Sequence, residues 1–263
     1  QYGHWLERVL FHFDFGYSFY NGKSCVAVLT AALKSTLILS FWALLFALFI
    51  GISLGIFTAT RADTLFDRII NGIMMVFIST PAFWLGLMLI GFFTIRLGWL
   101  PGSHLHSLYY DQLNSVGQLL DSVKHLILPV LTLGLPLAAT FFKYIRAGMI
   151  DALQSDYILA AKARGIRQST ILWKYSLKNS LLPVISILGI IIPALLSGAL
   201  IVEVVFALPG VGRAMVTAVF GRDYPILMAG ATLAFITVIF FNLIADICYM
   251  VVDPRIRNGP GGL

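Results

Sequence analysis

Long apolar stretches dominate the chain, and short segments between them hold nearly all of its charged residues. Five stretches approach or exceed the roughly 20 helical residues that cross about 30 Å of hydrocarbon. Their side chains do not alternate between apolar and polar over about ten residues, as the strands of a membrane barrel would. The pattern therefore predicts an all-α, polytopic membrane protein with spans at 35–60, 69–95, 125–142, 179–202 and 224–252.

Prolines occur in four of these five spans, and some of them lie close to a span's end. Membrane helices tolerate proline when neighbouring groups satisfy the freed carbonyls, so we expect kinked helices rather than broken ones, including at Pro81 in the second span. Gly51 and Gly55 in the first span form a pair of small residues four apart. Such a pair predicts a face where another helix approaches closely.

The composition excludes a soluble protein, because 59% of the residues are hydrophobic and only 11% are charged, with a mean hydropathy of +0.90. Soluble domains contain about 25% charged residues. We therefore expect a lipid bilayer and no nucleic acid as partner. Cys25 and Cys248 are too few for a thiolate metal site. His104 and His106, two apart in a loop, are more typical of plain surface than of a nickel site, so no metal or other cofactor is expected.

The distribution of basic residues predicts the orientation. The segments 61–68 and 143–179 and the tail from Asp253 hold eleven Lys and Arg residues, against seven in the segments of the other side, which are 1–34, 96–124 and 203–223. The positive-inside rule places 143–179 and the C-terminus in the cytoplasm. Five spans then leave the N-terminus outside without a signal peptide, so we expect one more N-terminal helix in the full-length protein.

The segment 143–179 contains a short predicted helix that begins near Ser155. Ser155 suits the N-cap, Asp156 places negative charge in the first turn, and Gly165 suits the left-handed position that ends a helix. About nine helical residues are not stable alone in water, so this helix is expected to dock on something. That can be another protein's groove or the lipid headgroups. The small side chains that would leave a slim surface for a groove are Ala160, Ala161 and Ala163.

Five motifs occur in order along the second half of the chain, and the first of them covers this helix. They are D-Y-x-x-A-A-K-A-R-G at 156–165, L-K-N-S-L-L-P at 177–183, E-V-V-F-A-L-P-G-V-G at 203–212, R-D-Y-P at 222–225 and D-P-R-I-R at 253–257. Together they resemble the ABC-importer permeases of the dipeptide/oligopeptide/nickel branch. The chain departs from the general signature at Leu159, where the broader family has Glu. It also departs at Pro183, which lies farther from Gly165 than the Leu-Pro of the general signature lies from its glycine. Both departures look usual for this branch.

The resemblance implies a type I ABC importer permease fold, with six spans in the full-length protein, in the inner membrane. It implies no catalysis by this chain, which has no G-x-x-x-x-G-K-[ST] phosphate loop. The implied partners are a second permease that differs from this chain, two cytoplasmic ATPase subunits and an extracytoplasmic solute-binding protein. The implied coupling helix, which sits in a groove of an ATPase, consists of Asp156, Tyr157, Ala160, Ala161, Lys162, Ala163, Arg164 and Gly165.

The expected organisation is an extracytoplasmic segment at 1–34, a permease domain at 35–257 with the coupling loop 143–179, and a tail at 258–263. Glu203 and Asp246 are candidate gating or pathway residues, because ionisable groups at membrane depth are often functional, although each can also face an interfacial partner. A self-contained secondary transporter or channel is the alternative, disfavoured by the nearly charge-free spans. Dipeptides, oligopeptides, glutathione-like solutes and nickel chelates all remain open as substrates, and so does the identity of the second permease.

Overall fold

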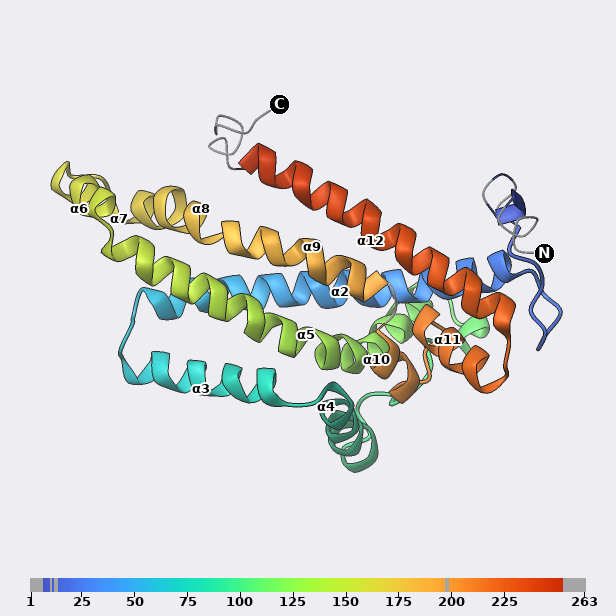
Figure 1. Cartoon of the computed structure of the whole chain (residues 1–263). Helices are drawn as coiled ribbons and strands as arrows, with labels where there is room; N and C mark the ends of the chain where they lie inside the picture. Colours follow the sequence, from blue (N-terminus) through green and yellow to red (C-terminus); the bar gives the residue numbers. More distant parts are fainter. Residues whose placement is uncertain (1–6, 10, 12–13, 197–198, 253–263) are drawn as a thin grey trace. The chain divides into compact units, whose positions relative to one another are not determined.

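The computed structural model describes residues 7–9, 11, 14–196 and 199–252, without the side chains at 245, 246 and 248–252. The described chain is helical apart from loops and one bridge between Tyr17 and Ser24. Its helices are α2 (Cys25–Ala59), α3 (Leu65–Ser79), α4 (Ala82–Leu89), η1 (Ile90–Arg96), η2 (Tyr110–Gln112), α5 (Ser115–Gln154), α6 (Asp156–Ala163), α7 (Gln168–Thr170), η3 (Ile171–Ser176), α8 (Leu177–Ser180), α9 (Leu182–Leu196), α10 (Leu200–Val205), α11 (Val211–Phe220) and α12 (Tyr224–Val252) (Figure 1).

Four helical stretches of the described chain are long and apolar enough to cross a bilayer. They are α2, α5, the stretch Leu182–Val205 and the part Tyr224–Ile244 of α12. A fifth span exists if α3 and the α4–η1 stretch are counted together. The predicted all-helical, polytopic fold is therefore confirmed, although α2 and α5 extend well beyond the predicted apolar spans.

The expectation of a single kinked helix around Pro81 is wrong. Thr80 is extended, with φ −85° and ψ 124°, and α4 begins only after Pro81. The proline ring disfavours a helical conformation for the preceding residue, and proline has no N–H to donate, so the helix ends here. By contrast, Pro129 and Pro136 lie within α5, and Pro193 lies within α9.

The chain divides into two compact units, formed by the described parts of 1–42, 81–133 and 193–240 and of 43–80, 134–192 and 241–252. In the second unit α2 and α5 pack closely. A Cβ atom added at Gly51 would lie 2.6 Å from the carbonyl oxygen of Ala138, and one at Gly55 would lie 2.7 Å from Cγ2 of Ile145. The predicted small-residue face is thus confirmed, since no larger side chain fits at either position.

An ion pair in the second unit joins the first turn of α3 to α5. Nε and Nη2 of Arg146 each donate to one oxygen of the buried Asp67 carboxylate, at 2.7 Å in both cases. This forked arrangement is the strong form of an arginine–carboxylate contact. Thr64, at the N-cap of α3, also accepts a hydrogen bond from the backbone N–H of Asp67. The pair therefore fixes the start of α3 against α5.

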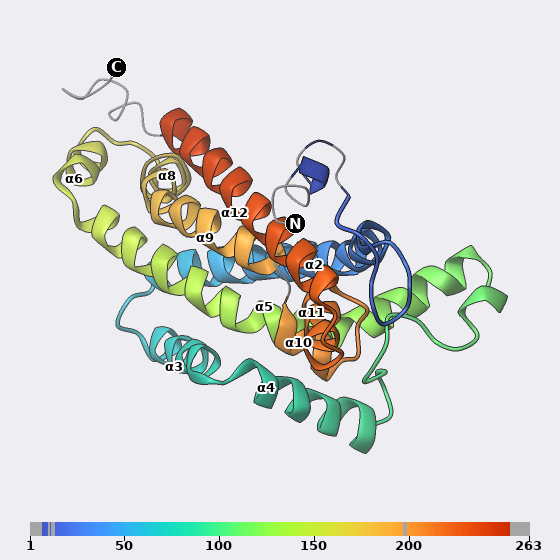
Figure 2. The same cartoon turned by 45° about the vertical axis from the view of Figure 1, so that its right-hand side comes forward.

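In the first unit, α10 packs against both α4 and α11, and Figure 2 shows α10 and α11 side by side. The buried apolar side chains around α10 are Leu39, Leu128, Val202, Phe206 and Leu208. Gly86 of α4 lies against Phe206, because a Cβ added there would be only 3.2 Å from the ring. This core supports α10, which contains Glu203, and the turn that leads from α10 to α11.

Candidate functional site

The short helix α6 forms where the sequence predicts it, and its C-terminus has a defined geometry. Gly165 has a φ of +73°, in the left-handed region. Its N–H bonds to the carbonyl of Lys162 at 2.9 Å, and the N–H of Ile166 bonds to the carbonyl of Ala161 at 3.2 Å. This pair of bonds is the Schellman arrangement, which satisfies the last carbonyls of a helix. The predicted helix end at Gly165 is therefore confirmed.

The N-terminus of α6 differs from the expectation. Ser155 occupies the N-cap position with extended backbone, but its side chain makes no cap hydrogen bond. Its hydroxyl instead donates to the carbonyl of Ala152, at 2.5 Å, near the end of α5. Asp156 lies in the first turn, as predicted, where its negative charge favours the positive end of the helix. The hydroxyl of Ser155 thus helps to end α5 rather than to begin α6.

One side of α6 is anchored inside the second unit. Ile158 and Ala161 are buried and pack with Ile171 in a small cluster, against which Leu153, Ile166 and Tyr175 are also packed. The expectation that Ala161 contributes to a free slim surface is therefore wrong, because its side chain is only 1% exposed. Positions three apart lie on the same face of a helix, which explains why Ile158 and Ala161 are buried together.

The other sides of α6 are exposed. Tyr157 is 42% and Leu159 54% exposed, so an aromatic and a large aliphatic side chain lie on the surface of so short a helix. The remaining exposed residues of the predicted coupling segment are Asp156, Ala160, Lys162, Ala163, Arg164 and Gly165. The exposed surface of this segment thus combines apolar, small, acidic and basic side chains.

Two motif segments that are separate in the sequence meet at α6. The side-chain N–H of Asn179 in α8 donates to the hydroxyl oxygen of Tyr157, at 2.8 Å. In Figures 1 and 2 α6 lies beyond the end of α5, near the helical stretch that contains α7 and α8. The contacts of α6 with η3 agree with this arrangement. The motifs at 156–165 and 177–183 therefore belong to one local structure.

Glu203, the first candidate pathway residue, is buried in the first unit and fully engaged. One carboxylate oxygen accepts from the Thr36 hydroxyl at 2.7 Å, and the other accepts from the backbone N–H of Arg213 at 3.0 Å. The Thr36 oxygen in turn accepts from the N–H of Val211, at 2.9 Å. Two of the otherwise unpaired N–H groups at the start of α11 are thereby satisfied.

The glycines of the same motif leave room for this carboxylate. A Cβ at Gly210 would overlap the carboxylate of Glu203, and one at Gly212 would lie 2.6 Å from the Cα of Leu200. Gly210 is also the N-cap residue of α11, a helix that the sequence analysis did not predict. The E-x-x-F-x-x-P-G-x-G spacing is therefore explained by a buried acid that caps a helix from across a tight turn.

Asp223, in the R-D-Y-P motif, is a second buried carboxylate of the first unit. It accepts from the hydroxyl of Ser18 and, at 3.1 Å, from the backbone N–H of Phe19. Burial by itself would raise the pKa of Asp223, but these hydrogen bonds outweigh it and lower the pKa below the ordinary value. Asp223 thus ties the N-terminal loop to the turn before α12.

Three predicted features lie wholly or partly outside the described residues. The backbone of Asp246, the second candidate pathway residue, belongs to α12, but its side chain lies outside the described residues, as do the motif at 253–257 and the tail at 258–263.

Sequence reasoning missed the Asp67–Arg146 pair and the partners of Glu203 and Asp223. Asp67 is three residues after Thr64, which signals a helix start, but no local pattern reveals its distant arginine.

Comparison with known proteins connects this local geometry to a family. Residues 51–258 match the family described as "Binding-protein-dependent transport system inner membrane component". The oligopeptide transport system permease protein AppB of Bacillus subtilis is 37% identical over 98% of this chain and 80% of its own length. The glutathione transport system permease protein GsiC of Escherichia coli K12 is 34% identical over 98% of this chain and 79% of its own length.

Solved structures show the same fold. The chain is similar to the inward-facing MetNI methionine ABC transporter, with a TM-score of 0.67 and 18% identity over 86% of this chain and 96% of that one. It is also similar to an amino acid ABC transporter, with a TM-score of 0.57 and 18% identity over 86% of this chain and 92% of that one. The predicted importer-permease fold is therefore confirmed.

Proposed function

Since this chain belongs to the binding-protein-dependent transport system inner membrane component family, we propose that it forms half of the translocation pathway for di- or oligopeptides and docks on its ATPase through α6. The chain is a non-catalytic, multi-pass permease subunit of an ABC importer of the inner membrane. Membership also implies an ATPase and a solute-binding protein as partners. The route of coupling, the substrate and the orientation are our proposals.

The exposed surface of α6 is the observation that carries the proposal for coupling. The helix is anchored on one side by Ile158 and Ala161, while Tyr157, Leu159 and Ala160 remain exposed. A helix held on one side and free on the others can enter a partner's groove without unfolding. ATP-driven closure of the ATPases would move α6, and this movement would shift the membrane helices between inward- and outward-facing states.

The orientation follows from this assignment. Because the ATPases are cytoplasmic, α6 and the basic segment 143–179 lie in the cytoplasm, and so does the C-terminus. The excess of Lys and Arg in the segments on this side supports the same orientation. The segments 1–34 and 203–223 then face outward, toward the solute-binding protein.

The relatives support a peptide as substrate. AppB is named for oligopeptides, GsiC for glutathione, and the permease DppB of Pseudomonas aeruginosa, 35% identical over 85% of this chain and 70% of its own length, for di- and tripeptides. Glutathione is itself a tripeptide, so all three names describe small peptides. We also propose that a second permease, different from this chain, completes the pathway.

Co-purification of the complex tests the proposal. This chain is tagged, produced together with the products of neighbouring genes and purified in mild detergent, as wild type and as Ala160→Arg. Ala160 is exposed, so the arginine changes the stability of the protein by less than about 0.5 kcal/mol. Thr60→Arg, an exposed substitution outside α6 on the side expected to be cytoplasmic, is the matched control.

We expect the wild type and Thr60→Arg to recover ATPase subunits and a second permease. Ala160→Arg should lose the ATPase while it still inserts in the membrane and retains the second permease. Normal ATPase recovery with Ala160→Arg would contradict the role of α6. Peptide uptake by this chain alone, in liposomes without ATP, would instead establish the secondary transporter.

A further inference from the structure

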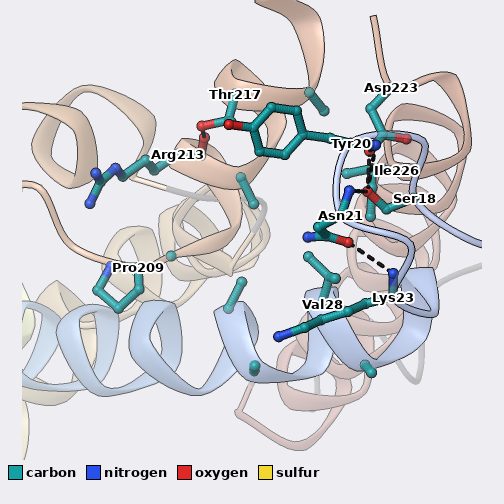
Figure 3. A pocket seen from close by; sticks show the side chains of 16 residues that line it. Ser18, Tyr20, Asn21, Lys23, Val28, Pro209, Arg213, Thr217, Asp223 and Ile226 are labelled. Atoms are coloured by element: carbon teal, nitrogen blue, oxygen red, sulfur yellow. Dashed lines mark hydrogen bonds between the residues drawn. The ribbon is translucent and has the colours of Figure 1, made fainter. Parts of the chain in front are cut away.

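A cavity of about 690 Å³ lies within the first unit, between the N-terminal loop, the first turns of α2, and α11 (Figure 3). Its volume is within the range of about 300–1,000 Å³ that is typical of small-molecule sites. Small and apolar side chains such as Ala31, Val28 and Ile226 form its walls. In the proposed orientation the cavity faces outward, where a solute arrives.

Cationic side chains line this cavity from two elements. Lys23 extends from the N-terminal loop along the start of α2, and Arg213 projects from α11 (Figure 3). The Arg213 guanidinium donates to the carbonyl oxygen of Ala207, which holds it at the edge of the cavity. Within the described residues no carboxylate oxygen lies within 4.0 Å of the Lys23 ammonium or the Arg213 guanidinium. The Arg213 guanidinium already donates to Ala207 and points away from Lys23 in Figure 3, so Lys23 is the cation that is available to an anion in the cavity.

The acidic side chain among the described lining residues is Asp223, and its oxygens are already engaged. They accept from the hydroxyl of Ser18 and from the N–H groups of Phe19 and Tyr20. Asp223 therefore fixes the loop and leaves the cavity with a net positive charge. A cationic ligand would meet Lys23, whereas an anionic ligand would gain a charge-assisted contact.

The loop that carries Lys23 is a built turn. The N–H of Ser18 bonds to the Lys23 carbonyl at 2.8 Å, and the N–H of Gly22 bonds to the Ser18 carbonyl at 3.0 Å. The N–H of Lys23 also bonds to the side-chain oxygen of Asn21, at 3.0 Å. Figure 3 shows the Tyr20 ring extending toward Thr217 of α11, on the side of the cavity away from Lys23. The cation is thus presented by a preorganised turn.

We propose that this cavity binds a small peptide through its terminal carboxylate, with Lys23 as the charge partner. The Asn21 amide and the Tyr20 hydroxyl supply further hydrogen-bonding groups, and the wall around Val28 contacts the peptide's side chains. This inference rests on the proposed function, since the orientation and the peptide class come from there. It assigns a ligand subsite on the permease itself, separate from the solute-binding protein.

Equilibrium binding of radiolabelled trialanine tests the assignment. The complex with its ATPase and second permease, without solute-binding protein, is placed in nanodiscs of phosphatidylcholine. The lipid is zwitterionic, so no net-anionic headgroup occupies the site. Lys23→Gln is compared with Lys34→Gln, which removes the same charge from an exposed position of α2 that does not line the cavity. Trialanine amide, which lacks the carboxylate, and inorganic phosphate serve as competitors.

We expect Lys23→Gln to weaken trialanine binding about tenfold, because it removes one hydrogen bond to a charged group. Lys34→Gln should bind as the wild type does, and neither the amide nor phosphate should compete effectively. No binding of trialanine, equal affinities for the two variants, or equal competition by the amide or by phosphate would overturn the assignment. ATPase co-purification is measured on the same samples: its loss contradicts the proposed function, whereas its retention confines a failure to this cavity.

Discussion

Two motif-bearing regions of this permease use their residues in opposite ways. In α6 (Asp156–Ala163) only Ile158 and Ala161 are buried, and the other motif side chains are exposed. In the segment from Glu203 in α10 to Arg213 in α11, the acid is buried, and its carboxylate accepts hydrogen bonds from the Thr36 hydroxyl and from a backbone N–H of α11. The first region leaves its surface free, and the second uses its polar groups within its own unit.

The difference shows that a motif residue has no fixed kind of role. Glu203 is ionisable and lies at the outer edge of a predicted span, which are the features that suggest a pathway residue. Its contacts account for its position as a helix cap, whether or not it also acts in gating. The exposed alanine Ala160 makes no such internal contact, so a partner is the better explanation of its place in the motif. The following experiments test this contrast.

Removing the buried carboxylate should have the largest effect. Glu203→Ala leaves the Thr36 hydroxyl and the N–H of Arg213 without their acceptor, and each unsatisfied buried group costs about 1–3 kcal/mol. We expect the free energy of unfolding to fall by about 2–4 kcal/mol, measured by denaturation in detergent. Glu203→Gln, which retains an acceptor oxygen, should lose less than half as much. If the two variants are equally stable, the capping role is wrong.

A methyl group added in the same turn should have a smaller effect. Gly212→Ala places its Cβ against the backbone of Leu200, and overpacking of this kind costs about 1–3 kcal/mol. The matched control is Gly72→Ala in α3, where nothing lies within 4 Å of the added Cβ. We expect a lower thermal midpoint for Gly212→Ala and no decrease for the control. Equal midpoints would show that the turn can relax.

The end of α6 should be less sensitive, because no atom lies near an added Cβ at Gly165 and only the left-handed backbone opposes the change. Gly165→Val should cost about 1–2 kcal/mol locally, whereas Gly165→Asn should cost less, since asparagine tolerates this conformation. Hydrogen exchange of residues 156–166 should accelerate in the valine variant more than in the asparagine variant. Similar exchange in both would contradict a backbone requirement at this position.

The smallest effect concerns pH. The pKa of Asp223 is lowered in the folded protein, so this group stabilises the fold above the unfolded pKa of about 3.9 and loses that contribution as pH falls through the folded pKa. Asp223→Asn should therefore be less stable than the wild type at pH 6, and the difference should narrow below about pH 4. Thermal midpoints measured from pH 6 to pH 3 test this. A constant difference would show that ionisation of Asp223 contributes nothing.

Much of this protein follows from local patterns. The apolar runs predicted helices that are long enough to cross a bilayer, because backbone groups in lipid must be satisfied within their own segment. The position of α6 and its end at Gly165 followed from the residues at its two ends, since glycine takes the left-handed conformation more readily than other residues do. The pair Gly51 and Gly55 predicted a close helix contact, because the spacing alone places both on one face.

Tertiary structure decided the rest. Ala161 is buried whereas Ala160 is exposed, and the cluster that covers Ala161 includes Ile171, ten residues later in the chain. The helix breaks at Pro81, whereas α5 continues through Pro129. A proline removes one helical hydrogen bond in both places, so the surrounding structure determines whether the helix holds together. Sequence patterns therefore determine which segments are helical, whereas contacts between distant residues determine which side chains remain free to bind a partner.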